Sequence, residues 1–180
     1  IDISKLPELE KLMLHKLYIL NEKFKANFRD YNFHVLYKEL LNFCTVDLSS
    51  FYFDIRKDTL YCEALNSYKR KNCITLLNII LQCLLKWFAP ILSFTTEEIY
   101  QLVKKEEDSQ SIHLQNFVSV PNSWNNKELS SNWEYVKKIR DEANISIENM
   151  RAEKSIGSSL EVMIEIKLNK EFYDKAKNID

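Results

Sequence analysis

Two clusters of cationic side chains are the clearest sign of a binding chemistry in this sequence. One cluster lies at positions 56–57 and the other at positions 69–71, with Phe53, Tyr61 and Tyr68 close to them in the sequence. Lysine and arginine hold phosphate groups, exposed aromatic rings stack on unpaired bases, and single-stranded RNA loops require both. The candidate RNA-binding residues are therefore Arg56, Lys57, Tyr61, Tyr68, Lys69, Arg70 and Lys71.

The same charges also fit a plainer interpretation, in which they are solvated helix ends. The net charge of the chain is −1, so it has no overall positive field, and an RNA surface requires that cations are segregated onto one face. A second cationic strip follows the last predicted helix. Its members do not all share one helical face, which makes them the weaker candidates: Lys137, Lys138, Arg140, Arg151 and Lys154.

The sequence predicts neither a catalytic nor a metal-binding constellation. His15, His34 and His113 are far apart, and none has ligand spacing to a carboxylate or a cysteine. Gly157 is the single glycine, whereas phosphate-binding loops of the Rossmann and P-loop types need several. We therefore expect no catalytic residue, metal site or bound cofactor in this chain. Without a C-x-x-C pair, reduced core thiols of a cytosolic protein are favoured over a zinc site for Cys44, Cys62, Cys73 and Cys83.

The composition is typical of a soluble globular domain. A chain of 180 residues is long enough to bury roughly 70% of the surface that its unfolded form exposes. No apolar run approaches the ~18 residues that a membrane span needs, so we expect no membrane partner. Residues 1–9 lack the order of a secretory signal. The cysteine pattern favours a cytoplasmic location. The chain opens with Ile1 instead of Met, and we interpret it as a fragment of a longer protein.

Hydrophobic periodicity predicts the helices that must position the two cationic clusters. Apolar residues recur at three- and four-residue steps over residues 8–28 and again over residues 33–55, and the second helix is expected to stop near residues 56–59. A third helix is predicted over residues 66–89, and its apolar part at residues 76–88 marks the centre of the bundle. Antiparallel pairing of the second and third helices would bring both clusters to one end.

Two capping signals predict where the later helices begin. Thr95 and Glu98 form a Thr-x-x-Glu capping box, with Phe94 and Ile99 at the positions of a hydrophobic staple, so a helix is expected to start directly after Thr95. The polar stretch over residues 104–128 is predicted to be a surface connection that contains one extended piece. A second box, at Ser131 and Glu134, predicts the start of the last long helix.

The C-terminal part predicts a change from helix to strand. The last long helix has an apolar stripe at heptad spacing, which in a compact chain favours bundle packing over a coiled coil. Gly157 is expected to supply a left-handed turn, and residues 160–168 alternate as a β-strand does. The predicted fold is mainly α, an antiparallel helix bundle over residues 1–153 followed at residues 154–180 by the start of a small, truncated α/β appendage.

Three segments resemble parts of one protein family, and they follow one another in the same order and at about the same spacing as in that family. They read NFCTVDLSSFYFDIRKDTLY at residues 42–61, KWFAPILSFTTEEIY at residues 86–100 and KSIGSSLEV at residues 154–162. Each is similar to a part of the helical anticodon-binding domain of the isoleucyl-tRNA synthetases, which are class I aminoacyl-tRNA synthetases. The resemblance implies a domain that contacts the anticodon stem and loop of tRNA(Ile). It also implies that a catalytic domain absent from this chain carries out the ATP-dependent aminoacylation.

The resemblance also implies partners and cofactors for the parent protein. The partners would be tRNA(Ile) and the catalytic and editing domains of the same polypeptide. ATP and Mg²⁺ would bind the catalytic domain, with zinc in members that end in a cysteine-rich module. The ATP-handling signatures of the family, His-Ile-Gly-His and Lys-Met-Ser-Lys-Ser, do not occur in the sequence. The fragment alone is therefore expected not to be catalytic.

Departures from the family pattern concern charge. Thr59 stands where arginine is frequent, which removes a planar guanidinium from the favoured cluster. Two alternatives stay open: the anticodon-binding domain of a related valyl, leucyl or methionyl synthetase, and a helical scaffold that binds a partner helix. An RNA-binding module should show one contiguous positive face, whereas a scaffold should expose an apolar stripe over residues 129–150.

Overall fold

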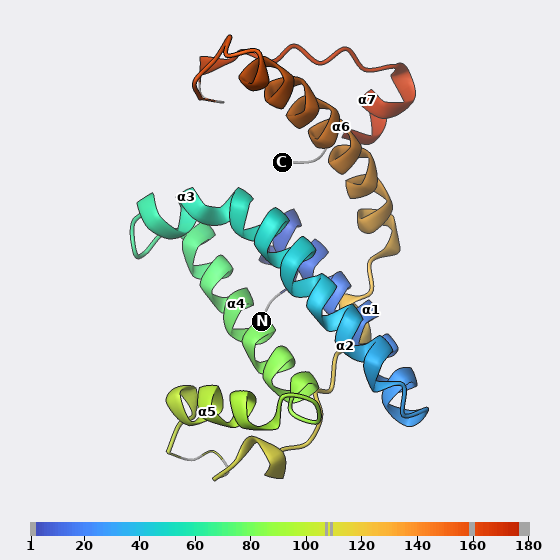
Figure 1. Cartoon of the computed structure of the whole chain (residues 1–180), viewed down its shortest axis with the longest axis vertical. Coiled ribbons are helices and arrows are strands. Elements are labelled where there is room, and N and C mark those ends of the chain that lie inside the picture. Colours follow the sequence, from blue (N-terminus) through green and yellow to red (C-terminus); the bar gives the residue numbers. More distant parts are fainter. Residues whose placement is uncertain (1–2, 107, 109, 159–160, 177–180) are drawn as a thin grey trace. The chain divides into compact units, whose positions relative to one another are not determined.

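A computed structural model describes residues 3–106, 108, 110–158 and 161–176, and these are mainly helical (Figure 1). The chain divides into two compact units, Ile1–Asn125 and Asn126–Asp180. The division falls inside the connection predicted at residues 104–128, so the last long helix belongs with the C-terminal segment. Each unit is described by itself below.

The first unit is built from three long helical segments. After a short 3-10 turn, η1 (Ile3–Lys5), helix α1 (Glu8–Arg29) confirms the first predicted helix. A continuous helical stretch follows as α2 (Phe33–Asn42), η2 (Phe43–Phe53) and α3 (Asp54–Cys62). Helix α4 (Tyr68–Phe88) confirms the third predicted helix and runs back beside this stretch (Figure 1). The fully buried side chains between them include Leu12, Met13, Leu17, Leu36, Leu40, Tyr52, Leu76 and Trp87.

The middle of the continuous stretch, η2, is a π-helix, in which hydrogen bonds span five residues instead of four. The Ser50 hydroxyl follows this spacing and donates to the Thr45 carbonyl oxygen at 3.0 Å. Because a π-helix needs more residues per turn, it shifts the inward-facing positions that follow. Tyr52 is fully buried, whereas Ile55, which the regular period placed on the buried face, is exposed.

The predicted end of the second helix near residues 56–59 is wrong. Helix α3 continues to Cys62, so Arg56 and Thr59 lie inside it. Apolar periodicity lapses there because residues 56–59 are polar or charged at every position. Arg56 takes an inward position, and Thr59 is buried.

Helix α1 ends without the glycine that usually closes a helix. The N–H of Asn32 donates to the Asn27 carbonyl at 2.8 Å and the N–H of Tyr31 to that of Phe28 at 3.3 Å, which is the Schellman pattern. Tyr31 occupies the left-handed position with φ 56°. A non-glycine residue there costs about 1–2 kcal/mol.

Helix α5 (Ser93–Val103) begins earlier than its predicted capping box allows. Thr95 therefore lies inside the helix, where the hydroxyl of its neighbour Thr96 donates to the Leu92 carbonyl at 2.9 Å, and the predicted capping box was wrong. Phe94 is 93% exposed, so the predicted hydrophobic staple was wrong as well. Glu97 has the anchoring role instead. Its carboxylate accepts hydrogen bonds from the Ser111 hydroxyl at 2.8 Å and from the Ile112 N–H at 3.0 Å.

The connection after α5 is held against the bundle. It contains the short turns η3 (Ile112–Leu114) and η4 (Asn122–Trp124). Ile112 is buried with Leu85 of α4, and the Phe117 ring meets Phe24 and Phe28 of α1 edge-on at 5.0 and 4.9 Å between centroids. The predicted surface connection is thus fixed to α1, α4 and α5.

The second unit is formed by α6 (Lys127–Ala152) and α7 (Lys170–Ala176). The Asn126 side chain caps α6 by accepting from the Leu129 N–H at 3.0 Å. Ser131 and Glu134 therefore lie inside the helix, and their predicted capping box was wrong. Helices α6 and α7 pack together, with the Tyr135 and Phe172 rings edge-on at 5.1 Å.

The end of α6 is again a Schellman pattern with a non-glycine residue. The Ser155 N–H donates to the Met150 carbonyl at 3.0 Å, and Lys154 holds the left-handed position with φ 56°. Gly157, which was predicted to supply the left-handed turn, has no positive φ. The prediction was wrong because the turn comes directly at the helix end.

The predicted β-strand at residues 160–168 is not supported. Residue 160 lies outside the described residues, and residues 162–169 follow an irregular path without strand pairing in the described part of the chain. A strand requires a neighbour for its backbone N–H and C=O groups. The described segment following Gly157 supplies only this one alternating run before α7 begins.

Candidate nucleic-acid interface

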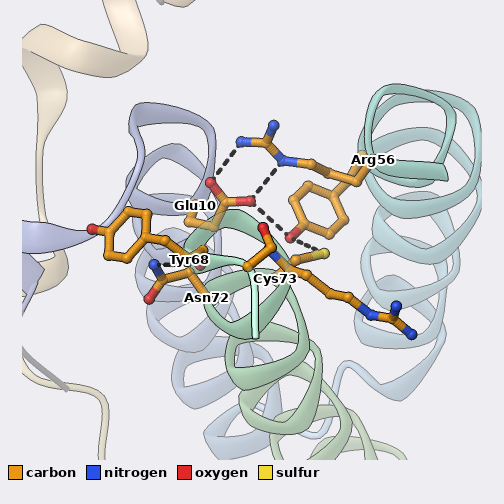
Figure 2. A network of polar contacts seen from close by, with 8 residues as sticks. Glu10, Arg56, Tyr68, Asn72 and Cys73 are labelled. Carbon is orange, nitrogen blue, oxygen red and sulfur yellow. Dashed lines mark hydrogen bonds and ion pairs between the residues drawn. The ribbon is translucent and has the colours of Figure 1, made fainter. Parts of the chain in front are cut away.

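A buried network of polar side chains joins four elements at the end of the bundle where α3 meets α4 (Figure 2). Glu10 of α1 is fully buried. Its carboxylate accepts hydrogen bonds from Arg56 Nε at 2.8 Å and Arg56 Nη2 at 2.7 Å, and from the Tyr52 hydroxyl at 3.1 Å. The same hydroxyl lies 3.1 Å from Cys73 Sγ of α4. The network therefore fixes α1, the η2–α3 stretch and α4 to one another.

The electrostatics of this network keep Arg56 in place. Burial opposes its charge, but the hydrogen bonds and negative charge of Glu10 outweigh burial and raise the pKa of Arg56. Burial, followed by the charge of Glu10, also raises the pKa of Tyr52, which therefore stays protonated. A bidentate arginine–carboxylate pair in a dry site is strongly bound, and removing one partner leaves an uncompensated buried charge. Arg56 is thus a structural residue.

The turn between α3 and α4 is held by side-chain hydrogen bonds. Ser67 is the N-cap of α4, and its hydroxyl accepts from the Arg70 N–H at 3.4 Å and donates to the Glu63 carboxylate. Arg70 Nη1 donates to the Glu63 carbonyl at 2.6 Å. Arg70 therefore closes the turn, and its guanidinium is partly withdrawn from solvent.

The outer surface of this turn exposes the aromatic candidates. Tyr61 is 85% exposed and Tyr68 is 55% exposed, and Leu65 between them is 79% exposed. Lys69 and Lys71 are exposed in the first turn of α4. The structure brings the two predicted clusters to one end, as the antiparallel pairing required, because five residues join α3 to α4. Leu65 was missed by the sequence analysis, since an isolated leucine in a turn carries no periodic signal.

The lysines of this surface are more available than its arginines. Lys57 is exposed and pairs with Asp54 at 3.0 Å, an arrangement that contributes little to stability in water. Lys69 and Lys71 complete the exposed cations of the two clusters. We name the surface formed by Lys57, Tyr61, Leu65, Tyr68, Lys69 and Lys71 the turn surface.

The second predicted strip lies on α6, in the other unit, and its cations are interleaved with carboxylates. Arg151 pairs with Glu148 at 2.7 Å, and Lys137 lies 4.0 Å from Glu134. The Lys138 ammonium lies 5.8 Å from the centre of the Tyr135 ring. Of the other two members, Arg140 is half-buried and Lys154 is exposed at the helix end.

The histidines, cysteines and carboxylates give no further site in the described residues. No group of three or more of these side chains is placed to hold a metal ion there. Cys73 and Cys83 are buried thiols, as predicted, whereas Cys62 is exposed, against the prediction. Burial raises the pKa of Cys83 to about 12. Over the same residues, no helix has the length and apolarity to cross a membrane.

Comparisons with known proteins define the class of this domain. Residues 10–167 match the family described as the anticodon-binding domain of tRNA ligase. The chain belongs to this family. The match favours the tRNA-binding interpretation over the helical scaffold.

The individual relatives that the chain matches are isoleucine–tRNA ligases. The chain is 61% identical over all 180 residues to the isoleucine–tRNA ligase of Pelagibacter ubique, 20% of which it covers. It is 43% identical over 156 residues, 87% of the chain, to that of Agrobacterium fabrum, and 40% identical over 169 residues, 94% of the chain, to that of Mesorhizobium japonicum. These alignments cover 16% and 17% of the two relatives. The resemblance to the isoleucyl family is confirmed, and the chain spans about a fifth of these relatives at most.

Proposed function

We propose that this chain binds the anticodon stem and loop of tRNA(Ile) and positions the tRNA for aminoacylation by other domains of an isoleucine–tRNA ligase. Those catalytic and editing domains, with their ATP, Mg²⁺ and any zinc, supply the chemistry, and the ligase acts in the cytoplasm. Family membership and the isoleucine–tRNA ligase relatives support this proposal.

The observation that carries the proposal is the turn surface. It has two exposed tyrosines and three exposed lysines at one end of the bundle. Tyrosine rings can stack on the unpaired bases of an RNA loop, at about 1–3 kcal/mol for each base. The lysines supply phosphate contacts, whose contribution falls as salt rises.

We infer two roles for the predicted residues. Arg56 and Arg70 hold the scaffold, because their guanidinium groups bond to Glu10 and to the Glu63 carbonyl. Phosphate contacts are therefore assigned to the lysines at positions 57, 69 and 71. Base stacking is assigned to Tyr61 and Tyr68. The buried network keeps the turn surface in a fixed position, which lowers the entropy lost on RNA binding.

The stacking role can be tested by titrating the chain with tRNA(Ile). Replacing Tyr61 by Ala should weaken binding by about 1–3 kcal/mol, with an unchanged salt dependence, because stacking releases no counterions. Tyr31→Ala is a matched control, since Tyr31 is an exposed tyrosine at the opposite end of the α2–α3 stretch. Equal affinity of the Tyr61→Ala variant and the parent chain would contradict the assignment.

A further inference from the structure

A groove runs along the solvent face of α4, separate from the turn surface. It has a volume of about 370 Å³. Helix α4 contributes one wall, and the connection that carries η4 contributes the other. The lining residues used below are Thr75, Asn78, Ile79, Gln82, Val118 and Trp124.

The groove combines an aromatic ring, aliphatic side chains and two amides. Trp124 is half-buried, and the η4 turn that carries it packs against α1. Asn78 and Gln82 are exposed, and within the described part of the chain their amides form no hydrogen bond with another residue. The groove therefore offers a ring for stacking beside unused donors and acceptors.

We propose that this groove binds an unpaired base of the tRNA. A nucleobase has two flat faces that stack on aromatic side chains and an edge that pairs with donors and acceptors. Asparagine and glutamine carry one donor group and one acceptor side by side, an arrangement that matches base edges. Ile79 and Val118 provide the apolar contacts that a base face also needs.

The position of the groove favours RNA as its occupant. Lys71, Thr75, Asn78 and Gln82 follow one another at steps of four, three and four residues, so they share one face of α4. At 1.5 Å per residue, Asn78 lies about 10 Å along the axis from Lys71 of the turn surface. An RNA strand whose phosphate is held at Lys71 can therefore present a nearby base to the groove.

A larger groove in the second unit differs in the charge of its lining. It lies between α6 and residues 162–172, has a volume of about 720 Å³, and includes the carboxylates of Glu142 and Glu165 in its lining. The lining also includes Lys138 and Lys167, and the two carboxylates offset the positive charge that these lysines would offer to phosphate. The α4 groove has no carboxylate among its lining residues, which distinguishes it as the RNA-binding candidate.

The inference rests on the proposed function, and the test uses tRNA(Ile) and its isolated anticodon stem-loop. Trp124→Ala should weaken binding about 5- to 150-fold with an unchanged salt slope, and Trp124→Phe should restore most of the affinity, because phenylalanine still stacks. Asn78→Ala combined with Gln82→Ala should weaken binding without altering the fold, since both residues are exposed. This pair also decides the question if Trp124→Ala fails to fold. Ile74→Ala is the control, because Ile74 is exposed on α4 outside the groove.

The outcomes separate this inference from the proposed function. If the groove variants bind like the parent chain while Tyr61→Ala loses affinity, the groove is not an RNA site and tRNA binding by the turn surface stands. If the parent chain binds neither RNA, the proposed function fails, and the groove inference fails with it.

Discussion

Helices α1 and α6 are both long and amphipathic, but they use their apolar faces in different ways. Helix α1 buries ten of its 22 residues, including the charged Glu10. Helix α6 is longer, with 26 residues, and among its described residues only Trp133 is buried. The first unit therefore has a closed core, whereas the apolar stripe of α6 is only partly covered and borders an open groove.

The difference between α1 and α6 indicates that the first unit has a stable core beneath its exposed turn surface, whereas the second unit has less core to support its charged surface. In the first unit, even charged groups such as Glu10 and Arg56 are fixed inside, so the exposed turn surface rests on a rigid base. In the second unit, cations alternate with carboxylates on a helix that has few core contacts. Changes to buried residues of the first unit should therefore cost more stability than matched changes in α6.

The largest effect is expected from breaking the buried ion pair. Replacing Glu10 by Ala leaves the Arg56 guanidinium buried without its partner and should lower the free energy of unfolding by about 3–5 kcal/mol. Urea unfolding followed by circular dichroism measures this. Lys25→Ala is a control, because its ion pair with Glu22 lies on the exposed face of the same helix and should contribute less than about 1 kcal/mol. Equal losses in the two variants would show that the network is not structural.

A smaller effect is expected from truncating matched aliphatic residues. Leu85 is buried in α4, and its replacement by Ala should cost about 2–5 kcal/mol. Ile147 of α6 is half-buried, and Ile147→Ala should cost less than about 1 kcal/mol. Hydrogen exchange of amides in α4 and in α6 would report each loss locally. A larger loss at α6 than at α4 would reverse the comparison.

Alkaline pH should weaken the first unit through its buried thiols. Burial raises the pKa of Cys83 from 9.0 to about 12 in the folded chain. A raised folded pKa means that the unfolded chain loses this proton first, so the associated stability is present below pH 9 and is lost between about pH 9 and 12. Thermal unfolding over this range should show a shallower fall for Cys83→Ala than for the parent chain. Parallel curves would contradict the assignment to Cys83.

The smallest expected effect is a gain in stability when glycine replaces the left-handed residue at either of two helix ends. Tyr31→Gly and Lys154→Gly should each stabilise their own unit by up to about 1 kcal/mol, because glycine adopts positive φ without steric cost. Tyr31 also meets the Phe33 ring edge-on at 6.2 Å, so its gain should be the smaller of the two. Melting temperatures test both changes, and a loss at Lys154→Gly would contradict the strain argument.

The sequence predicted where the helices lie better than it predicted which of their faces is buried. Apolar periodicity identified α1 and α4, because each keeps one regular helical period from start to end. It failed after η2, where the π-helix changes the phase. The run Phe51–Tyr52–Phe53 is aromatic at every position, so any choice of buried face fits the pattern equally well.

The sequence predicted that the two cationic clusters lie at one end of the bundle, but not which of their side chains bond within the fold. The short link between α3 and α4 brings the cationic clusters together, which the antiparallel pairing required. The sequence could not show that Arg56 faces inward, because its partner Glu10 lies 46 residues earlier. Glu10 itself resembles an ordinary acidic residue in the first turn of a helix, where it complements the helix dipole.

The central claim is that tRNA is held by the turn surface of the first unit and not by the cationic strip of α6. The direct test is a titration of the chain with tRNA(Ile) at several salt concentrations. Two double variants are compared: one carries Lys69→Ala and Lys71→Ala on α4, and the other carries Lys137→Ala and Lys138→Ala on α6. The slope of log affinity against log salt counts the counterions released. We expect the slope to fall by about two for the α4 pair and to stay unchanged for the α6 pair. A slope that falls only for the α6 pair would contradict it.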